Sequence, residues 1–196
     1  AIQGSPTTLT AITNVFQPNA KGKDPGKHPF KKYFEELETG DQLITEKRMI
    51  TAEDIDRFAD LTGDHFYAHI KTTHFTGTMF EQQVAHGYFI MSIATGLFVD
   101  SYEKNPVLLN YGIDELRFTK PVYPGSEIHI RFTCKQKLLN DKRVIDKPED
   151  FKRGDDIEKG DDIEKGIVKW LVEIFDETDE QVGIATILTM VAKHKS

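Results

Sequence analysis

The stretch from residue 63 to residue 69, Gly-Asp-His-Phe-Tyr-Ala-His, places one carboxylate and two imidazoles within seven positions. Asp64 and His69 lie five residues apart, and His86 and Gly87 follow where a long apolar run begins. A carboxylate and an imidazole together can move the protons of a water molecule. Free N–H groups at the start of a helix can stabilise negative charge on a carbonyl oxygen. These residues therefore indicate the addition of water beside a polarised carbonyl. From the residues alone, a polar loop cap is an equal alternative.

Two predicted helices flank this stretch and would position it. The first follows Thr51, a predicted N-cap, with Asp54 three residues later as in a variant of the capping box. Its apolar stripe falls at helical spacing and ends at Gly63: Ile55, Phe58, Ala59 and Thr62. The second, residues 87–102, is apolar on nearly every side, which predicts a helix buried in the core.

The remaining regular structure is predicted to be mainly β-strand. Strands are predicted at residues 42–50, 107–111, 116–119, 127–139, 167–177 and 181–193, where β-branched and aromatic residues recur and partly alternate with polar ones. Residues 71–83 predict a short irregular helix and a loop. A long apolar helix followed by several antiparallel strands predicts an α+β fold in which the sheet wraps around the helix.

Two segments predict irregular structure outside this core. Residues 1–30 are rich in Gly and Pro, which predicts an extended N-terminal arm or linker, and the domain itself is predicted over residues 31–196. A short docking turn is predicted from four apolar residues near this boundary: Phe30, Tyr33, Phe34 and Leu37. Residues 140–166 form a polar insertion with a tandem duplication at 154–165, which predicts a flexible loop. The spacing of its acidic residues lacks the loop glycine and the terminal bidentate glutamate of an EF-hand, so we do not predict calcium binding.

The composition narrows the possible partners and locations. A formal net charge of −7 disfavours nucleic acid, because phosphate binding needs a basic face. The single cysteine, Cys134, can form neither an internal disulfide nor a thiolate metal site alone, so we expect a small buried residue and a reducing cytoplasm. No metal site is predicted, because the other histidines are scattered: His28, His74, His129 and His194. We expect no signal peptide and no membrane span, since the longest apolar run is shorter than the roughly 20 residues that a bilayer requires.

Three segments together resemble one known family. Gly63-Asp64 with His69, the Val-Ala-His-Gly-Tyr sequence at 84–88 and the Arg-Phe-Thr-Lys-Pro-Val-Tyr-Pro-Gly sequence at 117–125 resemble the MaoC-like branch of the hot-dog fold, which includes (R)-specific enoyl-CoA hydratases. The resemblance implies a single hot-dog domain, with an antiparallel sheet wrapped around a long central helix. It also implies that Asp64 and His69 activate one water molecule, and that the backbone N–H of Gly87 binds the thioester oxygen.

The motif departs from the usual hydratase pattern at Phe66 and Tyr67, where Asn and Pro are usual. This version, together with residues 4–13, resembles the hydratase domain that follows an aldehyde dehydrogenase in the ring-cleaving enzymes of phenylacetate degradation. The resemblance implies oxepin-CoA as substrate, and a domain separated from its dehydrogenase. Phe66 and Tyr67 form either an apolar wall for the seven-membered ring or a pair of core aromatics under the loop. His86 either orders the loop or contacts the coenzyme part of the substrate.

The function implied by the resemblance is the addition of water to the β-carbon of a conjugated enoyl-CoA, which opens the ring of oxepin-CoA. No cofactor is expected, because coenzyme A belongs to the substrate. A homodimer is the smallest assembly expected, since hot-dog units commonly pair along their sheets. Three alternatives stay open: an (R)-specific hydratase of linear enoyl-CoA, a thioesterase, and a non-catalytic acyl-CoA-binding or assembly domain for an aldehyde dehydrogenase partner.

Overall fold

The computed structural model describes residues 27–71, 74–99, 104–139 and 164–194. Two α-helices, two short 3₁₀ turns and six strands follow one another along the chain: η1 (Pro29–Lys31), β1 (Gln42–Ile44), β2 (Arg48–Met49), α1 (Ala52–Thr62), η2 (Tyr67–His69), α2 (Gly87–Phe98), β3 (Val107–Phe118), β4 (Glu127–Leu138), β5 (Lys165–Phe175) and β6 (Gln181–Ala192). No helix in these ranges is long and apolar enough to cross a bilayer.

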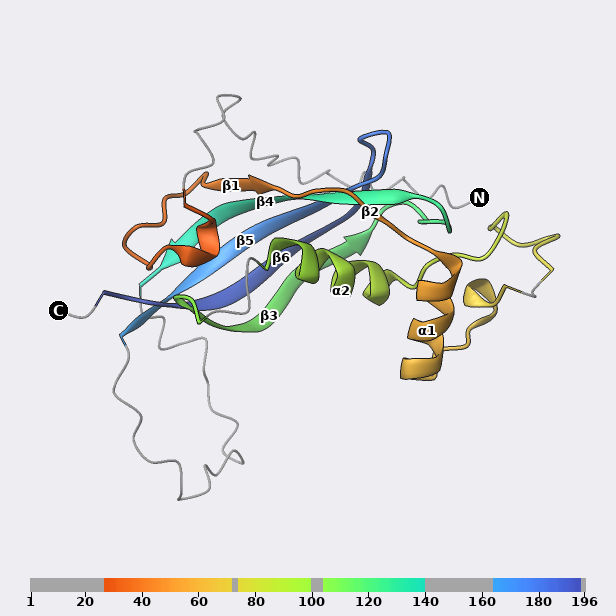
Figure 1. Cartoon of the computed structure of the whole chain (residues 1–196), viewed down its shortest axis with the longest axis horizontal. Coiled ribbons are helices and arrows are strands. Elements are labelled where there is room, and N and C mark those ends of the chain that lie inside the picture. Colours follow the sequence, from red (N-terminus) through yellow and green to blue (C-terminus); the bar gives the residue numbers. More distant parts are fainter. Residues whose placement is uncertain (1–26, 72–73, 100–103, 140–163, 195–196) are drawn as a thin grey trace, which may run out of the picture.

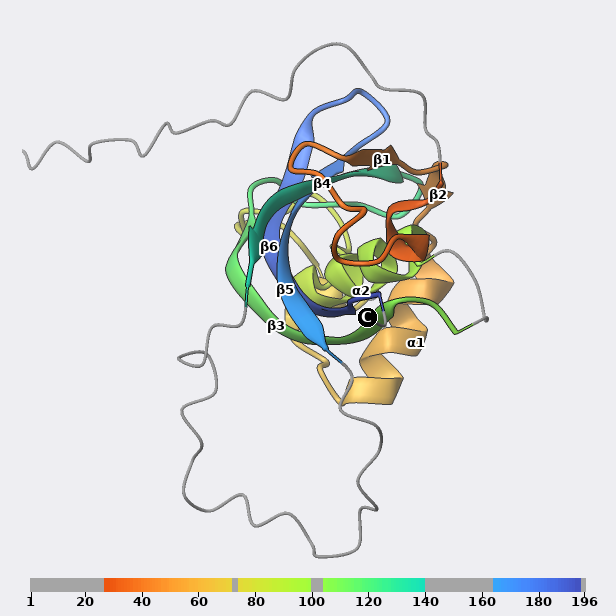
Figure 2. The ribbon, with the colours of Figure 1, turned by 90° about the vertical axis from the view of Figure 1, so that its left-hand side faces the viewer.

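One antiparallel sheet forms the body of the molecule. Its strand order is β1-β4-β5-β6-β3, and β2 pairs separately with β4. The sheet curves around α2, while α1 lies on the open side of the curve (Figures 1 and 2). The predicted α+β arrangement, with a sheet wrapped around a long central helix, is therefore confirmed.

The core lies between α2 and the concave face of the sheet. Five residues of α2 are buried: Phe89, Ile90, Met91, Ala94 and Phe98. Alternate residues of β4 face them, as expected for a strand with one buried face. Three aromatic rings stack in sequence: Phe98 lies 4.4 Å from Phe132, and Phe132 lies 4.5 Å from Trp170, between ring centroids. The indole N–H of Trp170 donates to Thr189 Oγ1 at 2.8 Å, so its one polar group is satisfied inside the core.

The predicted ends of α1 are confirmed. Thr51 accepts a hydrogen bond from the backbone N–H of Asp54, and the Asp54 carboxylate accepts one from the backbone N–H of Thr51. The helix ends at Gly63, which has a φ of 76° in the left-handed region that glycine adopts without steric cost. The next residue is Asp64, so the position at which α1 ends determines the position of the Asp64 carboxylate.

Several strand predictions differ from the structure. The strand predicted at residues 42–50 is two short strands, β1 and β2, each paired with β4. The strands predicted at 107–111 and 116–119 are one continuous strand, β3, whose register shifts near Glu115, a residue with a φ of 56°. The helix predicted within residues 71–83 does not occur in the described part of that segment, and the short helical turn lies earlier, at Tyr67–His69.

The predicted N-terminal arm and the predicted insertion are only partly described. Residues 1–26 and 140–163, which hold most of the predicted arm and insertion, lie outside the described residues. The predicted docking turn is confirmed, because Phe30, Phe34 and Leu37 are buried. Phe30 packs edge-on against the aromatic stack, including Phe98 and Trp170.

Candidate active site

The loop after α1 holds the carboxylate of Asp64 at the edge of the core. The backbone N–H of Phe66 donates to Asp64 Oδ1 at 3.3 Å, which is a local turn that an aspartate side chain commonly makes. The backbone N–H of Asp64 itself donates to Thr62 Oγ1 at 3.3 Å. Asp64 is exposed, so its carboxylate can reach both solvent and a bound molecule.

His69 is held in one tautomer by a backbone carbonyl. Its Nδ1 lies 2.7 Å from the carbonyl oxygen of Val84. Since a carbonyl only accepts hydrogen bonds, Nδ1 carries the proton and Nε2 of the neutral ring keeps a free lone pair. The ring is half-buried, and its backbone N–H donates to Phe66 O at 2.8 Å. Nε2 of His69 is therefore available to accept a proton.

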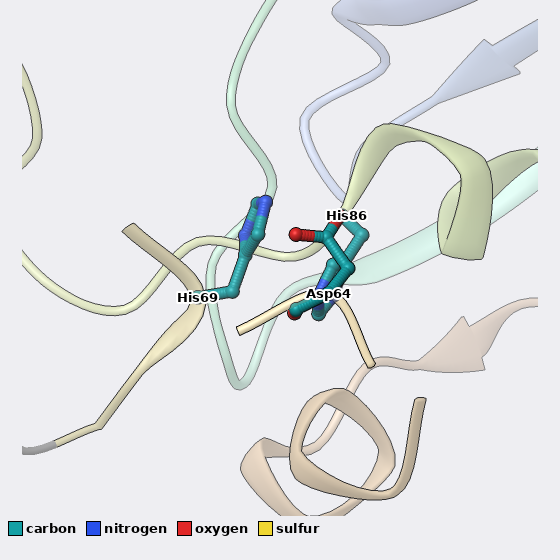
Figure 3. Close-up of side chains that lie close together, drawn as sticks. All are labelled: Asp64, His69 and His86. Carbon is teal, nitrogen blue, oxygen red and sulfur yellow. The ribbon is translucent and has the colours of Figure 1, made fainter. Parts of the chain in front are cut away.

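Asp64, His69 and His86 come together at one point. Each offers a nitrogen or carboxylate oxygen, and these three atoms lie within 4.8 Å of one another. Figure 3 shows the side chains of Asp64 and His69 projecting in the same direction. The carboxylate and the imidazole that the sequence singled out are thus close enough to share one small molecule.

His86 lies beneath this pair and joins it to the start of α2. Its Nε2 donates to the backbone oxygen of Asp64 at 2.9 Å, and its ring stacks on that of His69 at 3.7 Å. Burial lowers the pKa of His86, although the hydrogen bond to Asp64 acts in the opposite direction. The ring is therefore neutral at pH 7.

Gly87 is the first residue of α2, so its backbone N–H has no carbonyl partner within the helix. The positive end of the helix dipole adds to the attraction of that N–H for negative charge. A Cβ at this position would overlap the ring of Phe118. Any larger residue here would therefore force the ring of Phe118 to move, and Phe118 is a neighbour of the site that the sequence did not reveal.

A second neighbour, Gln83, was also missed. Its side-chain amide is buried and donates to the backbone oxygen of His69 at 2.8 Å and to Asp56 Oδ1 at 2.8 Å. These two hydrogen bonds connect the segment that carries His69 to α1. The only sequence feature that could have identified Gln83 is its position directly before the 84–88 motif. An uncharged polar residue in a loop is normally expected at the surface, so its burial was not predicted.

Phe66 and Tyr67 lie at the surface rather than in the core. Their exposed fractions are 56% and 41%, so the interpretation as core aromatics is wrong. Their ring centroids are 4.6 Å apart, and the centroid of Phe66 is 6.0 Å from that of His69. Both rings thus lie beside the predicted base, where a contact with substrate stays a prediction.

The three clustered side chains do not fit a metal ion. A ring nitrogen binds a metal along its lone pair, in the plane of the ring, at about 2 Å. The rings of His69 and His86 are stacked with an interplanar angle of 27°, so an ion in the plane of one ring would lie off the plane of the other. In addition, one nitrogen of each ring is engaged by a backbone carbonyl.

Cys134 is buried in β4, as predicted, and burial raises the pKa of its thiol to about 12. It is therefore a thiol, and not a nucleophilic thiolate, at neutral pH.

Comparison with known proteins places the site within a family. The model of the family described as MaoC like domain matches residues 35–153. Protein MaoC of Klebsiella aerogenes is 46% identical over 147 residues, which cover 75% of this chain and 44% of that protein. The 3-hydroxyacyl-thioester dehydratase Z of Mycobacterium tuberculosis is 35% identical over 81 residues, 40% of this chain and 54% of that protein. The chain thus spans about half the length of these curated relatives.

Solved structures agree with this assignment. An Archaeoglobus structure described as monoamine oxidase regulatory protein has a TM-score of 0.68 and 25% identity, and the match covers 84% of this chain and 96% of that one. A Mycobacterium tuberculosis protein described as having a double hotdog fold has a TM-score of 0.60 and 14% identity, over 84% of this chain and 45% of that one. The chain therefore has a hot-dog fold and belongs to the MaoC-like domain family.

Proposed function

We propose that this protein adds water to the β-carbon of a conjugated enoyl thioester carried by coenzyme A. The observation that carries the proposal is that a carboxylate oxygen of Asp64 and a ring nitrogen of His69 lie within 4.8 Å of each other. They lie beside the N-terminus of a buried helix. The relative named as a 3-hydroxyacyl-thioester dehydratase supports it, because dehydration of a 3-hydroxyacyl thioester is the reverse of this hydration.

The two side chains divide the work on one water molecule. Water bound between the Asp64 carboxylate and His69 Nε2 can give up a proton to one of them while its oxygen bonds to the β-carbon. The π electrons of the double bond move toward the thioester, and a proton then reaches the α-carbon. Because the two groups lie close enough to share one water molecule, we assign the acid and base duties to the pair and not to one residue.

The start of α2 would stabilise the charge that develops on the thioester oxygen. In the proposed complex this oxygen accepts a hydrogen bond from the backbone N–H of Gly87, with the positive end of the helix dipole behind it. Polarisation of the carbonyl makes the β-carbon electron-poor. The reaction therefore requires only acid–base groups and a backbone donor, and no cofactor beyond the coenzyme A of the substrate.

Replacement of the catalytic pair tests the proposal. Asp64→Asn keeps the shape of the side chain but removes the carboxylate, and His69→Ala removes the imidazole. We expect each to lower kcat for crotonyl-CoA by at least about 10²-fold, the lower range for loss of an acid–base group, while the melting temperature stays close to that of the parent. Near-normal turnover in both variants would refute the assignment, and free thiol release by the parent would identify a thioesterase instead.

For the substrate, we propose oxepin-CoA. Its β-carbon also carries the ring oxygen, so addition of water gives a hemiketal. When this collapses, the bond to the ring oxygen breaks, leaving a ketone at the β-carbon and an enol that becomes an aldehyde. The exposed rings of Phe66 and Tyr67 supply apolar surface next to His69 that a seven-membered ring could contact.

A linear enoyl-CoA is the second candidate substrate, and the relationship to 3-hydroxyacyl-thioester dehydratase Z favours it. Phe66→Asn distinguishes the two, because it restores the residue that is usual in hydratases of linear chains. If the ring of Phe66 supports oxepin-CoA, the variant should lose about tenfold in kcat/KM for oxepin-CoA, in line with the ~1–1.5 kcal/mol of an aromatic contact, and keep its activity on crotonyl-CoA. Equal losses on both substrates would refute this role.

For assembly, we propose a homodimer formed along β3. This strand lies at the edge of the sheet, and it carries three exposed apolar side chains: Leu109, Ile113 and Phe118. This twelve-residue strand pairs with β6 on one side only, so its outer edge offers N–H and C=O groups to a second strand. The exposed apolar side chains on the strand would be buried by such a contact. An aldehyde dehydrogenase domain in a longer parent protein is a further proposed partner, based on the resemblance of the motif alone.

A further inference from the structure

His86 makes two contacts that no other described side chain combines. It is only 2% exposed and stands at the N-cap of α2, yet its side chain makes no capping hydrogen bond there. Instead, Nε2 donates to the backbone oxygen of Asp64, and the flat face of the ring lies against His69. One ring thus contacts the residues that provide both the proposed carboxylate and the proposed base.

The protonation of this ring follows from its neighbours. The carbonyl of Asp64 only accepts a hydrogen bond, so Nε2 carries the proton. Nδ1 is buried and has no hydrogen-bond partner among the described residues. A second proton on this nitrogen would therefore create a positive charge without a partner in a buried place. The titratable groups that act on the ring are Asp64, His65 and His69, and Phe58 of α1 lies 5.0 Å away.

A neutral ring suits the chemistry next to it. When His69 accepts a proton from water, it becomes positively charged at a centroid distance of 3.7 Å from His86. A charged His86 would oppose that step by repulsion at close range in a region of low dielectric. A neutral, electron-rich ring face does not oppose it, and its packing also limits the orientations open to the imidazole of His69.

We propose that His86 is a positioning residue that fixes the Asp64 loop and the His69 ring relative to each other. This inference rests on the proposed function. His86 does not touch the reacting atoms in this role, and it acts through the two residues that do. The contacts of His86 that the structure shows are made within the protein, and a contact with the coenzyme part of the substrate is the alternative that a rise in KM would reveal.

Two substitutions separate the two contacts. His86→Gln retains an amide N–H that can reach the carbonyl of Asp64 but has no ring to stack on His69. His86→Phe retains a ring of similar shape but cannot donate. We expect each to lower kcat for crotonyl-CoA by about 10- to 100-fold, since a displacement of about 1 Å in a catalytic group costs on the order of 10²-fold. KM should change by less than about twofold, because the residue does not bind substrate.

His129 provides the matched control. Its Nδ1 is also buried without a partner among the described residues, and its ring stacks on Phe175 of β5 at 5.5 Å. His129→Gln and His129→Phe therefore make the same substitutions at a histidine of β4, whose Nε2 lies 3.6 Å from Asp179 Oδ1. We expect kcat to stay within about twofold of the parent in both, which would show that the loss at position 86 is specific to that position.

The outcomes distinguish failure of this inference from failure of the proposed function. If the parent does not hydrate any enoyl thioester, the proposed function is wrong. If the parent is active and Asp64→Asn and His69→Ala are inactive, unchanged kcat in both His86 variants overturns the inference alone. A rise in KM at constant kcat would identify a substrate contact instead, and a loss in only one variant would show that one of the two contacts is dispensable.

A measurement on the parent protein gives an answer even if the variants do not fold. Nitrogen-15 NMR of labelled histidine distinguishes the two neutral tautomers from the charged ring. We expect His86 to be neutral with its proton on Nε2 at pH 7, and His69 to carry its proton on Nδ1. A protonated His86 at this pH, or a proton on its Nδ1, would overturn the inference.

Discussion

Among the residues of the site, His86 makes a pH-dependent contribution to the stability of the fold. Its pKa is lowered in the folded protein mainly by burial, whereas in the unfolded chain it titrates near the ordinary value of about 6.5. The unfolded state therefore binds a proton at this residue more readily than the folded state does. It follows that stability from the neutral ring is fully present above about pH 6.5 and decreases as the pH falls toward the lowered pKa.

This difference predicts a pH-dependent component of stability that the His86 variants lack. We expect the free energy of unfolding of the parent to fall between pH 7.5 and pH 5.5, and we expect a smaller fall in His86→Gln. Urea titrations at the two pH values measure both. Neighbouring titratable groups, including Asp64 and His69, are common to the two proteins, so comparison of the slopes isolates His86. Equal slopes would contradict the assigned direction of the pKa shift.

The residues of the site differ in how far sequence could identify them. Asp64, His69 and Gly87 lie in short motifs with helix signals around them, so their spacing was enough to suggest that they meet. The tautomer of His69 and the buried amide of Gln83 could not be predicted, because both depend on carbonyl groups brought close by tertiary folding. The burial of His86 was missed for the same reason.

At the level of elements, α1 is the support for the Asp64 loop. Thr51 and Asp54 exchange two hydrogen bonds at its start, and Arg48 forms an ion pair with Asp54 at 3.2 Å. These contacts lower the pKa of Asp54, although its partial burial acts in the opposite direction. The helix is fixed at one end by this capping box and at the other by Gly63, so its length determines where Asp64 stands.

Thr51→Ala removes the side-chain half of the capping box. We expect a loss of about 1 kcal/mol in the free energy of unfolding, the usual cost of losing an N-cap hydrogen bond. Activity at 25 °C should remain, because a domain of this kind has several kcal/mol in reserve. Chemical denaturation measures the change, and Thr51→Ser, which keeps the hydroxyl, should remain within about 0.5 kcal/mol of the parent. A similar loss in the serine variant would mean that the methyl group, and not the cap, is responsible.

Elements with strong local signals were predicted well, and elements defined by a distant partner were not. The two ends of α1 were read from Thr51, Asp54 and Gly63 because capping is a local interaction. The division of residues 42–50 into β1 and β2 depends on β4, since Thr45 exchanges hydrogen bonds with Ile130 between the two strands. The irregularity of β3 near Glu115 likewise arises from its pairing with β6.

For the whole molecule, the proposed dimer interface lies along β3. A charge placed in the middle of the edge strand should prevent a second copy from pairing there, as charged residues do on natural sheet edges. We expect Ile113→Lys to raise the dimer dissociation constant by at least about tenfold, roughly 1.4 kcal/mol, as measured by sedimentation. Ile44→Lys is the control, because Ile44 is an exposed residue on β1, at the opposite edge of the sheet. Dissociation by the Ile44 variant alone would place the interface at that edge instead.

The packing of Trp170 gives this chain an internal optical probe. The sequence contains one tryptophan, and its indole is fully buried against Phe132, so all indole fluorescence comes from a single position in the core. Exposure of that indole to water shifts its emission to longer wavelength. Every substitution discussed above leaves this ring and its stacking neighbours in place. A variant that loses turnover but keeps the emission wavelength of the parent therefore has an intact core and a defect in the catalytic site.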